Sequence, residues 1–102
     1  MGEKILVRVD PEIAHLVPRF LQNRHQDAQA IREALAKGDF EAVRILGHSM
    51  KGIGEGYGFV PVTQLGSSLE QAAREGDVEK VRKSVEELQT YLDSVEVVHA
   101  EP

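Results

Sequence analysis

The chain contains no cysteine, which excludes a disulfide framework and thiolate-based metal or redox chemistry. It also has no apolar run near the roughly 20 residues that are needed to span a bilayer. Its first ten residues, MGEKILVRVD, lack the basic region and the long apolar core of a signal peptide. These absences fit a protein of the reducing cytosol, so we expect a cytoplasmic location.

An excess of basic residues and a large aromatic content are also missing. Lysine and arginine number 12 against 17 acidic residues, a net charge of −5, which argues against a general nucleic-acid binder because such a protein needs a basic footprint. With three Phe, two Tyr and no Trp, we expect an aliphatic core. The 102 residues suffice for one hydrophobic core and are too few for two, which predicts a single domain over residues 1–102.

Helical signals dominate the chain. Asp10-Pro11-Glu12 combines an N-cap aspartate, a proline at the first helical position and an acid in the first turn. Pro18 follows soon after, which predicts a short helix near 11–16 that kinks or restarts into a longer one ending near Lys37. Gly38-Asp39 and Gly76-Asp77 each close one helix with glycine and cap the next with aspartate. They indicate two tight antiparallel turns.

Apolar residues recur at the 3-and-4 spacing of a helix with one buried face. We expect helices from Asp39 to about Glu55, from near Pro61, and from about Val78. Their predicted core residues are Val43, Leu46, Met50 and Ile53; Val62, Leu65, Leu69 and Ala72; and Val81, Val85, Leu88, Leu92 and Val95.

These helices predict an all-α fold, an antiparallel four-helix bundle whose core spans about residues 11–95. The segment Lys4 to Val9 is β-prone, but a lone strand has no partner. We therefore expect residues 1–10 to form an extended arm packed along the bundle. Residues 98–102 are expected to be a tail, disordered from His99 onward.

The most informative segment is GHSMKGIGEGYGF, residues 47–59. On the predicted helix, His48, Lys51 and Gly52 lie opposite the apolar stripe and therefore face solvent. Glycine within a helix costs about 1 kcal/mol relative to alanine, so Gly52 requires a reason. We expect that a bulky group must approach His48 and that a side chain at 52 would obstruct it.

The pentapeptide HSMKG resembles the H-x-x-K-G signature of histidine-containing phosphotransfer (HPt) domains, the relay modules of two-component signalling. Gly58, ten residues after the histidine, matches a glycine that the family often carries just past that helix, and residues 66–73 resemble the next family helix. The resemblance covers about residues 11–95. Two features depart from the family pattern: Gly56, where many members carry asparagine, and the leading segment Lys4 to Val9.

The resemblance implies that His48 accepts a phosphoryl group from a receiver-domain aspartate and passes it to another receiver. Lys51 would stabilise the charge in transfer, and Gly52 would give steric access. The implied partners are a response-regulator receiver domain and a hybrid sensor histidine kinase, with Mg²⁺ held by the receiver. The chain would then be a monomeric relay protein without an ATP site of its own, rather than an enzyme.

Three further residues, Arg44, Glu55 and Gly56, lie near His48 and are candidate partner-binding residues, although Arg44 and Glu55 could equally be solvated charges. The glycine run does not complete G-x-G-x-x-G or a Walker motif, which disfavours a nucleotide site. His15, His25 and His99 lack zinc-ligand spacing, so no metal site is predicted. An alternative function remains open: a helical docking or scaffold module that binds a receiver or kinase without being phosphorylated.

Overall fold

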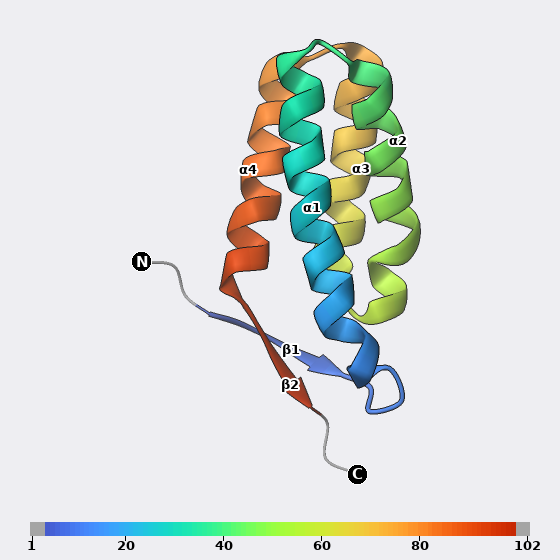
Figure 1. Cartoon of the computed structure of the whole chain (residues 1–102), viewed down its shortest axis with the longest axis vertical. Helices are drawn as coiled ribbons and strands as arrows, with labels where there is room; N and C mark the ends of the chain where they lie inside the picture. Colours follow the sequence, from blue (N-terminus) through green and yellow to red (C-terminus); the bar gives the residue numbers. More distant parts are fainter. Residues whose placement is uncertain (1–3, 100–102) are drawn as a thin grey trace.

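The computed structural model describes residues 4–99. Within that range the chain forms four α-helices that run alternately up and down and are connected by short turns (Figure 1). Their bounds are α1 Val17–Ala36, α2 Phe40–Ile53, α3 Val60–Glu75 and α4 Val78–Ser94. The predicted helical bundle is confirmed.

The two Gly-Asp turns have the geometry that their residues predict. Gly38 and Gly76 adopt left-handed conformations, with φ of 72° and 64°, which glycine reaches without the steric penalty of a Cβ. The Asp39 carboxylate accepts a hydrogen bond from the backbone N–H of Ala42 at 3.0 Å. Asp77 accepts one from the N–H three residues further on, at 3.1 Å. Both helix starts are thus capped by the expected side chains.

The N-terminal helix differs from the prediction. Asp10 accepts a hydrogen bond from the Glu12 N–H at 2.8 Å, but the following residues form a turn and then a 3₁₀ turn, η1 (Ala14–Leu16). The long helix α1 starts directly after it, with Pro18 in its first turn. A proline there removes an N–H that has no intrahelical acceptor, so Pro18 starts the helix rather than interrupting one.

The unpaired arm was a wrong prediction. Residues Ile5–Val9 form strand β1, which pairs in parallel with a second strand, β2 (Val95–His99). α4 therefore ends at Ser94, and Val95 belongs to a strand rather than to the helix stripe. Val98 and His99, which were expected in the tail, belong to β2 and pair with Arg8 and Val9; residues 100–102 of that tail lie outside the described residues.

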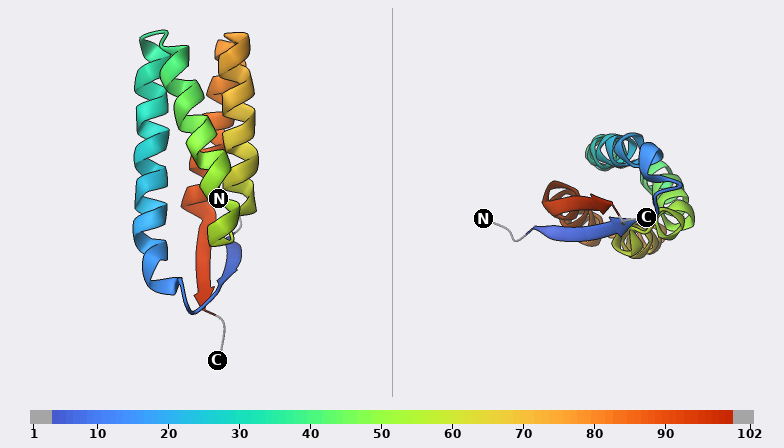
Figure 2. Two further views of the ribbon diagram at one scale, coloured as in Figure 1. Left: turned by 90° about the vertical axis from the view of Figure 1, so that its right-hand side faces the viewer. Right: turned by 90° about the horizontal axis from the view of Figure 1, so that it is seen from below.

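The core lies between the four helices and is closed at one end by the strand pair, as the side view and the view from below show (Figure 2). Val9 of β1 is 1% exposed, so the strand contributes directly to the core. The expectation of an aliphatic core needs one correction. Phe20 stacks on Tyr57 and Phe59, with ring centroids 4.4 and 5.2 Å apart, so an aromatic cluster joins α1 to the segment after α2.

Candidate functional site

Helix α2 has the two faces that its sequence predicts. Val43 and Met50 are fully buried, whereas the side chains of His48 and Lys51 are 69% and 50% exposed. Gly52 is also exposed. The imidazole, the ammonium group and the open glycine therefore occupy one solvent-facing side of α2.

A carboxylate from the neighbouring helix connects His48 and Lys51. Glu70 of α3 places Oε2 2.9 Å from His48 Nδ1 and Oε1 3.5 Å from Lys51 Nζ. Its side chain is only 6% exposed, so it is held between the helices. An ionised carboxylate can only accept a hydrogen bond, so this contact puts the proton of a neutral imidazole on Nδ1. The lone pair of Nε2 is then free for chemistry.

Several positive groups keep the Glu70 carboxylate charged. Burial alone would raise its pKa, but the hydrogen bond from His48, the charge of that ring when it is protonated, and the charges of Arg74 and Lys51 together lower the pKa below its ordinary value of 4.5. Arg74, one turn further along α3, places Nη2 3.2 Å from Glu70 Oε2. Glu70 is thus an anion near neutral pH that orients one imidazole and two cations.

The alternate glycines after His48 have different structural reasons. A Cβ at Gly54 would lie 2.6 Å from the backbone nitrogen of Thr63, so this glycine permits close packing of α2 on α3. Gly58 has φ of 88°, a left-handed conformation that favours glycine. A Cβ at Gly52 or Gly56 would meet nothing within 4 Å. Packing therefore does not require these two glycines, and both leave open space on the surface.

The candidate partner-binding residues are less closely tied to His48. The Arg44 guanidinium forms an ion pair with Glu41, one turn back on the same helix. Glu55 and Gly56 lie in the 3₁₀ turn η2 (Glu55–Tyr57) and are exposed. The backbone N–H of Glu55 donates to Thr63 Oγ1 at 2.7 Å, which fixes this turn against α3.

Sequence reasoning missed Glu70 and Arg74. In the segment LEQAARE, residues 69–75, both residues read as solvated charges on the polar side of a helix. One signal was available. Gly66 lies one turn before Glu70, and a small residue there allows another helix to approach closely, which would bury the charge beside it.

The other histidines do not join the site. His15 and His25 are exposed, and the Nδ1 of His25 contacts Gln89 of α4 at 3.3 Å. Among residues 4–99, no group of three or more His, Cys, Asp or Glu side chains could hold a metal ion. Within the same part of the chain, no helix is both long and apolar enough to cross a membrane.

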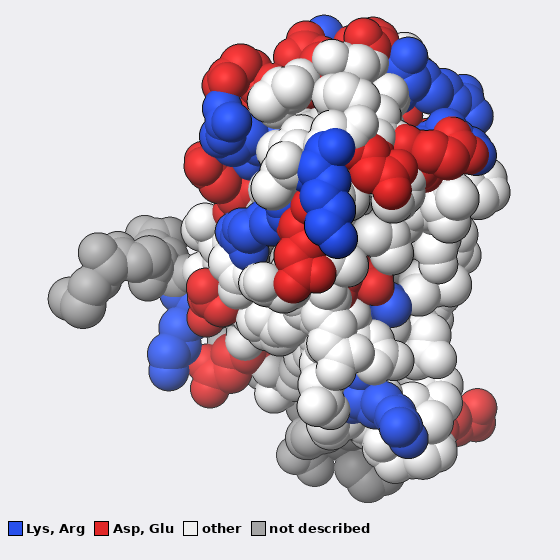
Figure 3. All heavy atoms as spheres, turned by 45° about the horizontal axis from the view of Figure 1, so that its top comes forward, with Lys and Arg blue, Asp and Glu red and all other residues white. Residues whose placement is uncertain are grey.

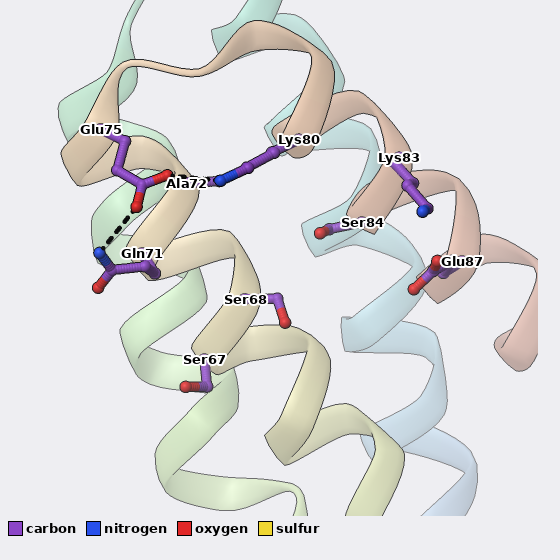
Figure 4. A pocket seen from close by; sticks show the side chains of 9 residues that line it. All are labelled: Ser67, Ser68, Gln71, Ala72, Glu75, Lys80, Lys83, Ser84 and Glu87. Carbon is purple, nitrogen blue, oxygen red and sulfur yellow. Dashed lines mark hydrogen bonds and ion pairs between the residues drawn. The ribbon is translucent and has the colours of Figure 1, made fainter.

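A polar groove between α3 and α4 lies apart from this site (Figure 4). Its charged side chains are partly paired with one another: Lys80 contacts Glu75 at 3.1 Å, and Gln71 donates to the same carboxylate at 3.1 Å. At the end of the bundle that carries the two Gly-Asp turns, positive and negative side chains are intermixed (Figure 3). His48 is not among the residues that line this groove, and its charged neighbour is Glu70, between α2 and α3.

A comparison with protein-family models finds a match over most of the chain. The model described as Hpt domain matches residues 15–97, which include all four helices and the Glu70 cluster. No curated protein and no solved structure matches the chain. Hpt domains are phosphotransfer modules of two-component signalling rather than ATP-binding kinases. Since the match spans most of the sequence, the chain belongs to the Hpt domain family.

Proposed function

We propose that the protein is a phosphorelay intermediate that carries a phosphoryl group on His48 between the aspartates of receiver domains. The observation that carries the proposal is the 2.9 Å contact between His48 Nδ1 and Glu70 Oε2 beneath an exposed imidazole. That contact holds the ring in the tautomer whose Nε2 is an unprotonated nucleophile at the surface.

The proposed transfer is a direct displacement at phosphorus. Nε2 of His48 attacks the aspartyl phosphate of the receiver, the N–P bond forms, and the bond from phosphorus to the aspartate oxygen breaks to release a carboxylate. No proton has to leave the imidazole, because Nε2 carries none before the attack. The ring becomes a cation that keeps its Nδ1 proton, and the Glu70 carboxylate offsets that new charge. Attack by a second aspartate on the same phosphorus reverses these steps.

Lys51 and Gly52 have separate roles in this mechanism. The Lys51 ammonium, 3.5 Å from Glu70 Oε1, lies one helical turn from His48, where it can neutralise part of the charge on the phosphoryl oxygens. Gly52 leaves room for the receiver to bring its aspartate to Nε2. We assign Arg44, Glu55 and Gly56 to the surrounding receiver contact. The partner set is a receiver domain and a hybrid sensor histidine kinase, and the relay acts as a cytoplasmic monomer.

The test is phosphotransfer from purified receivers of the same genome, each charged with acetyl phosphate. We expect the wild-type protein to gain a label that is stable in base and labile in acid, as a phosphoramidate is. His48→Gln should remove the label and keep the fold, because position 48 faces solvent. The matched control is His25→Gln, which replaces another exposed histidine and should label normally. Label on His48→Gln would mean that another residue accepts the phosphoryl group.

The same experiment identifies the alternative function. If no receiver or kinase labels the protein, yet one binds it equally well before and after His48→Gln, the domain is a docking module. A binding titration run beside the labelling assay distinguishes the two functions.

A further inference from the structure

Helices α2 and α3 are in close backbone contact beside the site. A Cβ at Gly66 would lie 2.5 Å from the backbone nitrogen of Lys51 and 2.7 Å from the carbonyl oxygen of Gly47. A Cβ at Gly47 would lie 2.8 Å from both the Glu70 nitrogen and the Gly66 oxygen. Ordinary carbon contacts lie at about 3.5–4.0 Å, so even a methyl group would force the helices apart by about 1 Å.

The atoms that crowd these positions belong to the backbone, so rotation of a side chain cannot relieve the contact. They also belong to the site: Lys51 and Glu70 themselves supply two of the crowding nitrogens. Gly47 immediately precedes His48, and Gly66 lies one turn before Glu70. The distance between the two backbones therefore sets the distance between the imidazole and the carboxylate.

We infer that Gly47 and Gly66 are positioning residues, because their backbone contact holds Glu70 within hydrogen-bond reach of His48. The inference rests on the proposed function for its effect on transfer, but the hydrogen bond can be observed without any phosphoryl donor. The present Nδ1–Oε2 distance is 2.9 Å, and a separation larger by about 1 Å exceeds the range of a hydrogen bond. Glu70 is too enclosed to restore the contact by reorienting freely.

The test combines Gly66→Ala with nitrogen NMR of the His48 ring. In the wild-type protein we expect the neutral imidazole to carry its proton on Nδ1. Gly66→Ala should reduce the population of that tautomer and slow phosphotransfer by about ten- to hundredfold, since a misplacement of about 1 Å can cost a reaction about 10²-fold. An unchanged tautomer and an unchanged transfer rate in a folded Gly66→Ala protein would overturn the inference.

A control variant separates positioning from loss of stability. Val81→Ala in α4 creates a cavity at a fully buried position on a helix that does not carry the site. It should lower thermal stability and leave the His48 tautomer and the transfer rate unchanged. If Val81→Ala altered both as strongly as Gly66→Ala, the effect would be general loosening of the fold and the inference would be wrong.

A second variant tests the same distance without touching the helix contact. Glu70→Asp shortens the side chain by one methylene group and so withdraws the carboxylate from His48 while both glycines remain. It should reproduce the tautomer change and the slower transfer even if Gly66→Ala fails to fold. A wild-type tautomer population and transfer rate in Glu70→Asp would show that the distance between the carboxylate and His48 does not limit transfer. Failure of the wild-type protein to accept phosphate would instead contradict the proposed function and leave the tautomer result valid.

Discussion

Substitutions at Gly52 should change stability and phosphotransfer in opposite directions. This glycine lies in α2, and a Cβ there would meet nothing within 4 Å. Alanine therefore fits without strain, and it removes the backbone entropy cost of a helical glycine, about 0.5–1 kcal/mol. For a domain of this size, 1 kcal/mol corresponds to about 4–8 °C in Tm. We expect Gly52→Ala to raise Tm by about 2–8 °C.

The transfer rate should fall as the side chain at position 52 grows. Position 52 is one helical turn after His48, so Gly52→Gln projects its side chain beside the imidazole, where the receiver has to approach. We expect near-normal transfer for Gly52→Ala and a loss of about tenfold or more for Gly52→Gln, the size of effect that misplaced reacting groups produce.

The measurements are thermal melting by circular dichroism and rapid-quench transfer from one charged receiver. Thr90→Gln, at an exposed position of α4, adds a side chain of similar size away from α2 and should leave transfer unchanged. If Gly52→Gln transferred at the wild-type rate, the steric explanation of this glycine would be refuted. If Gly52→Ala melted at a lower temperature than the wild-type protein, the conclusion that a side chain at position 52 meets open space would be wrong.

Three further predictions concern charge, pH and the strands. Lys51→Ala should slow transfer by about tenfold and leave the affinity for the receiver unchanged. The loss should be smaller than the ~10²-fold or more that follows removal of a buried oxyanion donor, because the Lys51 ammonium is half exposed. An unchanged transfer rate in quench-flow measurements would contradict this role of Lys51. The lowered pKa of Glu70 stabilises the fold above pH 4.5, its ordinary value, and this stabilisation is lost as pH falls through the lowered value. Urea unfolding should therefore show the wild-type advantage over Glu70→Gln shrinking between pH 7 and pH 3, and an equal advantage at both would refute the assignment. Val97→Pro should lower Tm by removing an N–H from β2, while transfer stays normal because the strands lie at the end of the bundle; slowed transfer would show that the strands support the site.

The helices could be predicted because each carries its own local signals. Asp39 and Asp77 cap two helix starts, and the apolar stripe of α2 identifies its buried face without reference to any other element. The exposure of His48 follows from the same stripe. These features depend on residues within a few positions of one another, which a single sequence displays directly.

The strand pair and Glu70 depend instead on contacts between distant segments. Val95 continues the apolar spacing of Leu88 and Leu92, so periodicity alone extends α4 through it. Only its pairing with Ile5 makes the strand preferable. Glu70 directly follows a core leucine, so the sequence predicts a solvated charge at this position. Its burial depends on how closely α2 approaches α3, which the sequence of α3 does not display. Residue propensities and apolar periodicity describe only local sequence, so they predict neither the β1–β2 pairing nor the approach of α2 to Glu70.

The pairing of β1 with β2 also has a consequence for the order in which the protein folds. Ile5 and Val95 lie near opposite ends of the chain, so their contact closes nearly the whole chain into one loop, whereas α2 and α3 are joined by a short turn. Loop-closure entropy grows with the length of the loop, and non-local contacts slow folding. We expect the α2–α3 hairpin to form early and the strands to pair last. In native-state hydrogen exchange, the amides of β1 and β2 should then open at lower free energy than those of the helices around His48.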